Sequence, residues 1–183
     1  LIGRLHQCKT RLKRLRTARR AGMSAATYCR TAGIPAMLYG ADCCGVSETM
    51  LQNQRGVIAR AVSPDTYGRL PDLVFQSLAA QGKDTDPALE VCALPIGRWA
   101  LAVWDSWIPL DLLRSFFANA LERLDAVRDH LWSNVVGPAA ACIATLWRLG
   151  WSASSATEFT DDIGVEWDLL RHAPALLRSA VHR

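Results

Sequence analysis

The sequence predicts a mainly α, helical bundle-like fold with a short β-hairpin near residues 152–169. Apolar residues recur at spacings of three and four in several segments, and Gly, Pro and Ser lie where such segments would begin or end. Half of the 183 residues are hydrophobic and seven are Trp. A chain of this length can bury roughly 68–70% of its unfolded surface, so a hydrophobic core is expected.

The first predicted helix is basic and ends near Gly22, a suitable C-terminal cap. Its apolar residues form one stripe that we expect to pack inward: Ile2, Leu5, Cys8, Leu12 and Leu15. Ser24 is the predicted N-cap of a second helix, which runs toward Gly33. We expect the Ile34-Pro35 step to interrupt that helix, because a residue before proline disfavours the helical backbone.

A third helix is predicted after the N-cap Ser47, and Ser63-Pro64 ends it. A short helix over 72–81 lies between two segments, 63–72 and 82–87, that are rich in Pro, Gly, Asp, Ser and Thr. This composition predicts a boundary there. The sequence thus divides into a basic helical region, 1–64, and a second helical region, 65–183.

Five further helices are predicted in the second region, over 88–92, 96–107, 110–130, 139–149 and 174–181. Pro138 is favourable at the first position of the fourth, and Gly150 ends it. Between Trp151 and Leu169 the period changes from helical to alternating, which predicts the hairpin with a turn at Asp161-Asp162. Trp99, Trp104 and Trp107 lie in an apolar helical pattern and are expected in the core.

Positive charge is concentrated at the start of the chain. Residues 1–20 have a net charge of +8 and no acid; the first carboxylate is Asp42. The remaining 13 of the 21 Lys and Arg face all 17 Asp and Glu, which leaves −4 on the rest of the chain. The cations of the first helix are Arg4, Lys9, Arg11, Lys13, Arg14, Arg16, Arg19 and Arg20.

Such a cluster attracts phosphate by Coulomb attraction and counterion release, so these eight residues are the predicted nucleic-acid-binding residues. Basic helices also bind acidic membranes, calmodulin-like grooves and import receptors. The apolar stripe is narrow and lacks Trp or Phe, which favours nucleic acid over a membrane. No apolar run reaches the ~20 residues that a bilayer-spanning helix needs. We expect no membrane partner and an intracellular protein, nuclear or cytoplasmic.

The six cysteines show no C-x-x-C pair, and reduced core thiols are favoured over disulfides. The four histidines are never four residues apart, and no glycine-rich phosphate loop is present. Residues 159–162, Phe-Thr-Asp-Asp, match the Phe/Tyr-x-Asp-Asp string with which polymerases hold two metal ions. That chemistry also needs a third carboxylate on a neighbouring strand. Asp-Asp is common in turns, so we expect no catalytic residues, no metal and no cofactor.

A resemblance adds a family to this interpretation. Residues 30–42, RTAGIPAMLYGAD, resemble a block found downstream of the polymerase palm in non-LTR (LINE-type) retrotransposon reverse transcriptases, where it follows basic thumb-like helices. The continuation resembles the connecting region before ribonuclease H, at 71–74 (PDLV), 94–104 (LPIGRWALAVW), 137–140 (GPAA) and 161–164 (DDIG). Only LYGA, at 38–41, is moderately specific.

The resemblance implies a fragment of a reverse transcriptase polyprotein whose catalytic Asp-Asp would precede Leu1. Residues 1–64 would then be a thumb-like region that binds the backbone phosphates of an RNA/DNA template-primer duplex, with Tyr39 packed rather than reading a base. Residues 65–183 would be a connecting domain, and the rest of the polyprotein would be a partner. Two alternatives stay open: a structural or interaction remnant without nucleic-acid binding, and a metal-dependent enzyme using Asp161 and Asp162.

Overall fold

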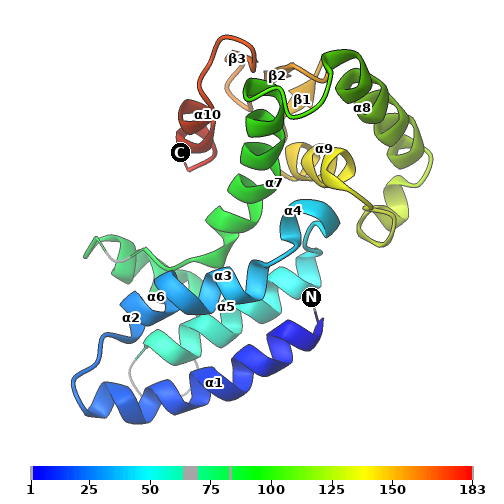
Figure 1. Ribbon diagram of the computed structural model, residues 1–183. Coiled ribbons are helices and arrows are strands. Elements are labelled where there is room, and N and C mark those ends of the chain that lie inside the picture. Colours follow the sequence, from blue (N-terminus) through cyan, green and yellow to red (C-terminus); the bar gives the residue numbers. More distant parts are fainter. Residues whose placement is uncertain (1, 64–69, 83, 183) are drawn as a thin grey trace. The chain divides into compact units, whose positions relative to one another are not determined.

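The computed structural model describes residues 2–63, 70–82 and 84–182, without the side chains of Ile2, Leu12, Lys13, Arg16 and Arg20. The fold is mainly α-helical with a small three-stranded antiparallel sheet, which confirms the predicted fold class (Figure 1). The chain divides into two compact units. The first unit comprises Leu1–Tyr39 and Ser47–Glu90, and the second comprises Gly40–Val46 and Val91–Arg183.

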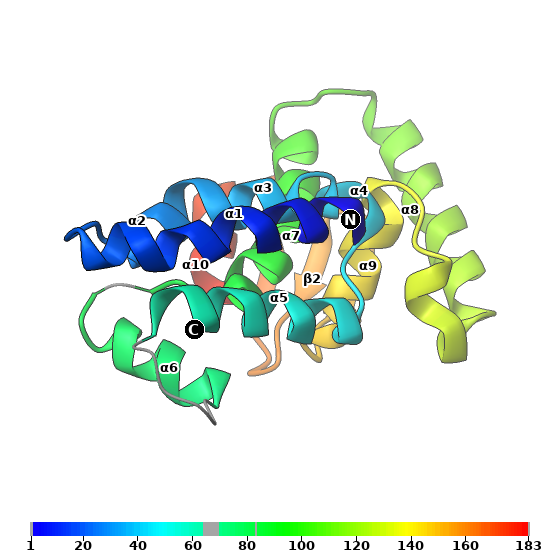
Figure 2. The same cartoon turned by 90° about the horizontal axis from the view of Figure 1, so that it is seen from below.

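Helix α1 (Ile2–Arg20) packs against α2 (Ala25–Tyr28), α3 (Ile34–Leu38) and α5 (Glu48–Val62) in the first unit, as Figures 1 and 2 show. Leu5, Cys8 and Leu15 are buried, which confirms these members of the predicted stripe. The side chains of the other two members, Ile2 and Leu12, lie outside the description.

The predicted interruption at Ile34-Pro35 is wrong, because the helix continues through a wider turn. Ser24 caps its start by accepting a hydrogen bond from the Thr27 amide at 3.3 Å, as predicted. The turn Cys29–Gly33 is π-helical, and the Ile34 amide donates to the Cys29 carbonyl five residues earlier. Proline has no N–H, and its ring crowds the carbonyl of the preceding turn. A π-turn directly before Pro35 relieves that conflict, since it widens the backbone there.

Helix α6 (Pro71–Ala79) belongs to the first unit because Arg55 of α5 holds the segment around it. The Arg55 guanidinium donates to Asp86 at 2.7 and 3.0 Å and to Asp72 at 2.6 Å. Hydrogen bonding to Asp86 is the main cause that raises the pKa of Arg55. The composition predicted a boundary at residue 64. The compact units of the structure do not divide there. The boundary falls within α7, between Glu90 and Val91.

The chain also enters the second unit at 40–46, where backbone geometry requires glycine. Gly40 has a φ of +85° at the start of the short helix α4 (Ala41–Cys44), which packs against α9 (Pro138–Arg148). Gly45 has a φ of +58°, and a Cβ there would lie 2.8 Å from the Trp132 ring. The Gly137 amide donates to the Cys43 carbonyl at 2.9 Å. These contacts make 40–46 part of the second unit.

Two predicted helices of the second unit, 88–92 and 96–107, form one helix, α7 (Pro87–Trp104), with Pro95 inside it. An internal proline costs about 3 kcal/mol. Val91, Ile96, Trp99 and Val103 are buried along α7, and this burial offsets the cost.

The predicted helix 110–130 is shorter than expected: α8 spans Leu110–Asp125, and a 3₁₀ helix, Arg128–Ser133, follows it. At Val127, between the two, φ is −131° and ψ is 32°, outside the α region. The α9 start at Pro138 and the last helix, α10 (Pro174–Val181), are as predicted.

The predicted hairpin is present and gains a third strand. Strands β1 (Ser152–Ala153), β2 (Glu158–Thr160) and β3 (Glu166–Asp168) pair antiparallel in that order. Phe159 is fully buried and stacks with Phe117, with 6.1 Å between the ring centroids. The Phe117 ring in turn lies 5.4 Å from the Trp99 ring, also between centroids. The Trp99 indole N–H donates to the Ala156 carbonyl at 2.8 Å. This aromatic row joins α7, α8 and the sheet in one core.

The six cysteines are free thiols, as predicted, but the prediction that they lie in the core is wrong for Cys44. Cys29 and Cys142 are fully buried, whereas Cys44 is exposed. Burial raises the pKa of the Cys29 thiol to about 12 and also raises that of Cys142.

No helix in the described part of the chain is long and apolar enough to cross a membrane.

Thiol labelling of the native chain tests the packing of both units, because Cys29 is buried in the first and Cys142 in the second. N-ethylmaleimide, which reacts with the thiolate, should modify Cys44 first and leave Cys29 and Cys142 unmodified until denaturant is added. Raising the pH to 9 should not make Cys29 reactive. Burial raises its pKa to about 12, so the thiol stays protonated at pH 9. Peptide mass spectrometry measures each site. Labelling of Cys29 as fast as Cys44 would contradict the packing of the first unit.

Replacing Arg55 tests the anchoring of α6. Arg55→Ala leaves Asp86, whose side chain is only 16% exposed, without its cation. We expect the free energy of unfolding to fall by about 2 kcal/mol in urea titrations. The matched control is Arg171→Ala, which removes an ion pair to Asp168 from a side chain that is 84% exposed, and should cost less than about 0.5 kcal/mol. Equal losses in the two variants would count against the anchor.

Candidate nucleic-acid interface

The described cations of α1 divide into four exposed residues and one that is turned inward. Arg4, Lys9, Arg11 and Arg14 are exposed, and none of them forms an ion pair with a described residue. The helix contains no acid that would neutralise them. We call these four exposed residues the basic face; around the helix, Arg4, Arg11 and Arg14 lie on one side of the buried stripe and Lys9 lies on its other side. Because Leu5, Cys8 and Leu15 are buried in the first unit, the rotation of α1 is fixed and the basic face stays in solvent.

Arg19 does not belong to the basic face, although the charge pattern included it. It is half-buried, and its guanidinium donates to the carbonyl of Ser63, the residue that ends α5. This hydrogen bond joins the end of α1 to the end of α5 within the first unit. The side chains of Lys13, Arg16 and Arg20, also predicted to bind nucleic acid, lie outside the description.

Tyr39 extends the basic face, which the sequence did not predict. Its side chain is 69% exposed rather than packed, and the Arg4 guanidinium lies 4.0 Å from the centre of its ring. A cation above an aromatic face is an attractive contact, worth about 0.5–1 kcal/mol when exposed. Exposed aromatic rings beside cations can also stack on nucleic-acid bases. No spacing rule links residues 4 and 39, so only the packing of α3 beside α1 could show this contact.

The Phe-Thr-Asp-Asp string is accounted for by the fold of the second unit. Phe159 belongs to the aromatic core, and Asp161 is 6% exposed. The Asp161 carboxylate accepts hydrogen bonds from the amides of Ile163 at 3.2 Å and Val165 at 2.8 Å, and from the Trp167 indole at 3.1 Å. It therefore closes the turn between β2 and β3, while Asp162 is exposed.

Within the described residues, no three His, Cys, Asp or Glu side chains come together in a way that could hold a metal ion. The third carboxylate that two-metal chemistry requires is thus not brought to Asp161 and Asp162 by the described part of the fold. The geometry favours a structural role for Asp161.

Comparison with known proteins adds no family to these observations. No protein-family model, no curated protein and no solved structure matches the chain.

Asp161 and Asp162 can be compared directly by mutation. Asp161→Ala leaves two amides and an indole N–H without their acceptor, so we expect a loss of about 2–3 kcal/mol in the free energy of unfolding. Asp162→Ala, the matched control, should cost less than about 0.5 kcal/mol. Mg²⁺ should leave the melting temperature of the unmutated chain unchanged. Stabilisation by Mg²⁺ that disappears in Asp161→Ala would instead support the metal-dependent enzyme.

Proposed function

We propose that the first unit binds the backbone of an RNA/DNA template-primer duplex through the basic face of α1. In this proposal the chain is a non-catalytic, thumb-like piece and connecting piece of a non-LTR retroelement reverse transcriptase polyprotein. The resemblance of residues 30–42 to the block downstream of the palm supports the family. One observation carries the binding function: four exposed cations stand on a helix that has no acid and cannot rotate.

The chemistry of the basic face favours phosphate over base edges. Lysine and arginine side chains on a helix surface reach backbone phosphates, and such contacts position a duplex without reading its sequence. The exposed side chains beside them, His6, Gln7 and Thr10, add no negative charge. We therefore expect similar affinity for duplexes of different sequence and a steep dependence on salt.

Tyr39 is placed to add a contact of a second kind. Its exposed ring lies against Arg4, one of the basic-face residues. At the end of a duplex, or at a single-stranded template overhang, an exposed ring can stack on a base. This contact would contribute affinity that depends less on salt than the phosphate contacts do.

The proposal is tested by measuring how binding to a nucleic-acid duplex depends on salt. Fluorescence anisotropy with a labelled 20-base-pair RNA–DNA hybrid should show a linear fall of log K with log salt, with a slope of about −0.9 per neutralised phosphate. In the triple variant Lys9→Gln, Arg11→Gln, Arg14→Gln the slope should become less steep by about 3 units. Its affinity at low salt should fall about tenfold or more.

The matched control carries the same charge change elsewhere: Arg60→Gln, Arg114→Gln, Arg171→Gln, all exposed and outside α1. It should leave the slope within about one unit of the unmutated chain. If both triple variants lose affinity equally, only net charge matters and the basic face is not the site. No binding at 50 mM salt would favour the structural or interaction remnant.

A further inference from the structure

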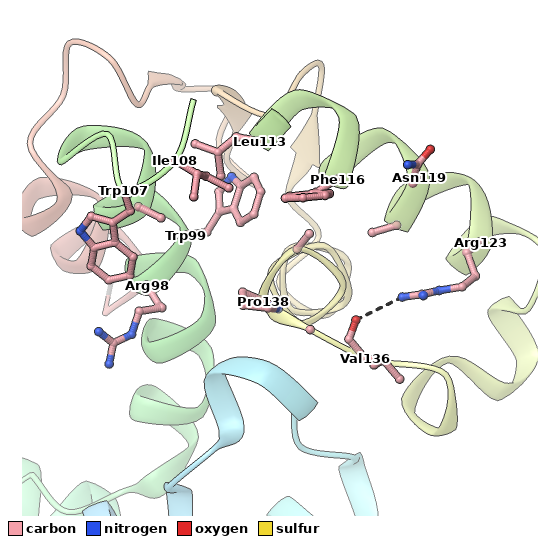
Figure 3. A pocket seen from close by; sticks show the side chains of 14 residues that line it. Arg98, Trp99, Trp107, Ile108, Leu113, Phe116, Asn119, Arg123, Val136 and Pro138 are labelled. Carbon is pink, nitrogen blue, oxygen red and sulfur yellow. Dashed lines mark hydrogen bonds between the residues drawn. The ribbon is translucent and has the colours of Figure 1, made fainter. Parts of the chain in front are cut away.

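The second unit contains an open, mainly apolar pocket of about 480 Å³ (Figure 3). Helix α7 and the segment after it form one wall, α8 forms the opposite wall, and the residues that lead into α9 form the floor. The apolar lining includes Trp99, Trp107, Ile108, Leu113, Phe116 and Pro138. The volume lies within the roughly 300–1,000 Å³ typical of binding pockets. All the lining residues come from one compact unit, so the pocket lies within it.

The rim of this pocket exposes large apolar side chains. Trp107 is 50% exposed, Phe116 is 51% exposed and Val136 is 69% exposed. Trp104, the last residue of α7, is 44% exposed, so only Trp99 of the three tryptophans expected in the core is buried. Apolar side chains that gather around a hollow mark an interaction site, whereas single exposed ones do not.

The turn just before Trp107 has a strained backbone. Helix α7 ends with the Trp107 amide donating to the Ala102 carbonyl at 3.1 Å, which places Ser106 at a φ of +51°. Glycine is the usual residue in this left-handed position, and a side chain there costs roughly 1–2 kcal/mol. The turn that presents Trp107 is thus kept at an energetic cost.

The charged groups that line the pocket are both cations. Arg98 and Arg123 come from opposite walls, and no Asp or Glu is among the lining residues. Arg98 bonds Asp42 at 3.2 Å and lies 5.7 Å from the Trp107 ring. Arg123 donates to the Val136 carbonyl at 3.2 Å, and within the described part of the chain no carboxylate pairs with it. Asp42 balances the charge of Arg98, so among the described residues Arg123 supplies the positive charge of the lining that no carboxylate balances, and an occupant with negative charge on its α8 side complements it.

The α8 wall is elongated. Phe116, Asn119 and Arg123 are three and four residues apart, so they form one row over about two turns, or roughly 10 Å. A row of this length matches two turns of a second helix laid along the groove. Trp107 and Val136 line the pocket and are still half or more exposed, so a helix along the groove would contact the lining and also cover the outer sides of these two residues.

We propose that this pocket is the docking site for an acidic amphipathic α-helix of a protein partner. Large apolar side chains at positions i, i+4 and i+7 of that helix enter between Trp107, Phe116 and Pro138, the helix-in-groove mode. Acidic residues on the flank of that helix that lies along α8 face Arg123. The docking site lies in the second unit and does not depend on nucleic-acid binding by α1.

Synthetic peptides test this docking. The probes are three 16-residue helical peptides with Leu or Phe at i, i+4 and i+7 and Glu on both flanks, together with three counterparts in which Lys replaces Glu. Titration calorimetry with the full chain should show saturable 1:1 binding of at least one Glu peptide. Its Lys counterpart should bind at least about tenfold more weakly.

Two pairs of variants locate the site. Phe116→Ala should weaken the Glu peptide at least about tenfold, whereas Leu112→Ala, which alters an exposed α8 residue outside the pocket, should not. Arg123→Glu should reverse the preference toward the Lys peptide, and Arg114→Glu, also exposed on α8, should leave it unchanged. Circular dichroism confirms that each variant is folded.

Three results would overturn the proposal. The first is no saturable binding of any Glu peptide up to about 1 mM. The second is equal weakening by the members of each variant pair, which would show that the pocket is not the site. The third is binding of decanoate, in a Phe116-dependent way, without binding of any peptide, because this would make the pocket a site for small apolar carboxylates.

Discussion

The candidate interface depends on the burial of one narrow stripe on α1. A helix with several cations and no acid is disfavoured by repulsion between neighbouring charges, and an isolated helix gains little from propensity alone. Leu5, Cys8 and Leu15 supply the missing stability by packing in the first unit. The same contacts fix the rotation of the helix, so the stripe that makes α1 fold also decides which cations face solvent. Arg19 follows from this constraint too: it is half-buried and bonded to the Ser63 carbonyl instead of facing water.

In the second unit, residues that resemble functional strings are explained by packing and backbone geometry. Phe159 completes the row from Trp99 through Phe117, and Asp161 closes the turn that brings β3 beside β2. The LYGA block at 38–41 is where the chain passes from the first unit to the second. Leu38 is buried in the first unit, Gly40 adopts a positive φ, and Ala41 is buried in the second unit. A larger side chain at 40 or 41 would disturb this passage, which gives the block a structural reason independent of catalysis.

Local rules predicted the helices well where local chemistry decides the structure. The Ser24 and Ser47 caps, the start of α9 at Pro138 and the bounds of α10 follow from residues within one turn. The same rules failed at Pro35 and Pro95, where a π-turn and tertiary burial outweigh the local preference of proline. The second unit's inclusion of 40–46 was likewise not predictable, because contacts distant in sequence establish it. The pocket was missed for the same reason: its walls come from segments that no periodicity connects, and its aromatic residues look like core residues in the sequence.

The two surfaces differ in the physical origin of any affinity, and this makes them separable in one molecule. The basic face offers charge with little apolar area apart from Tyr39, so its interactions weaken steeply as salt rises. The pocket offers apolar area with two cations at its walls, and burial of apolar surface persists at high salt. Salt therefore selects between them: a ligand retained at about 1 M salt, where the Debye length is about 3 Å, cannot be held mainly by the basic face. An acidic helix attracted nonspecifically to α1 would be released under those conditions, while one seated between Trp107 and Phe116 would stay bound.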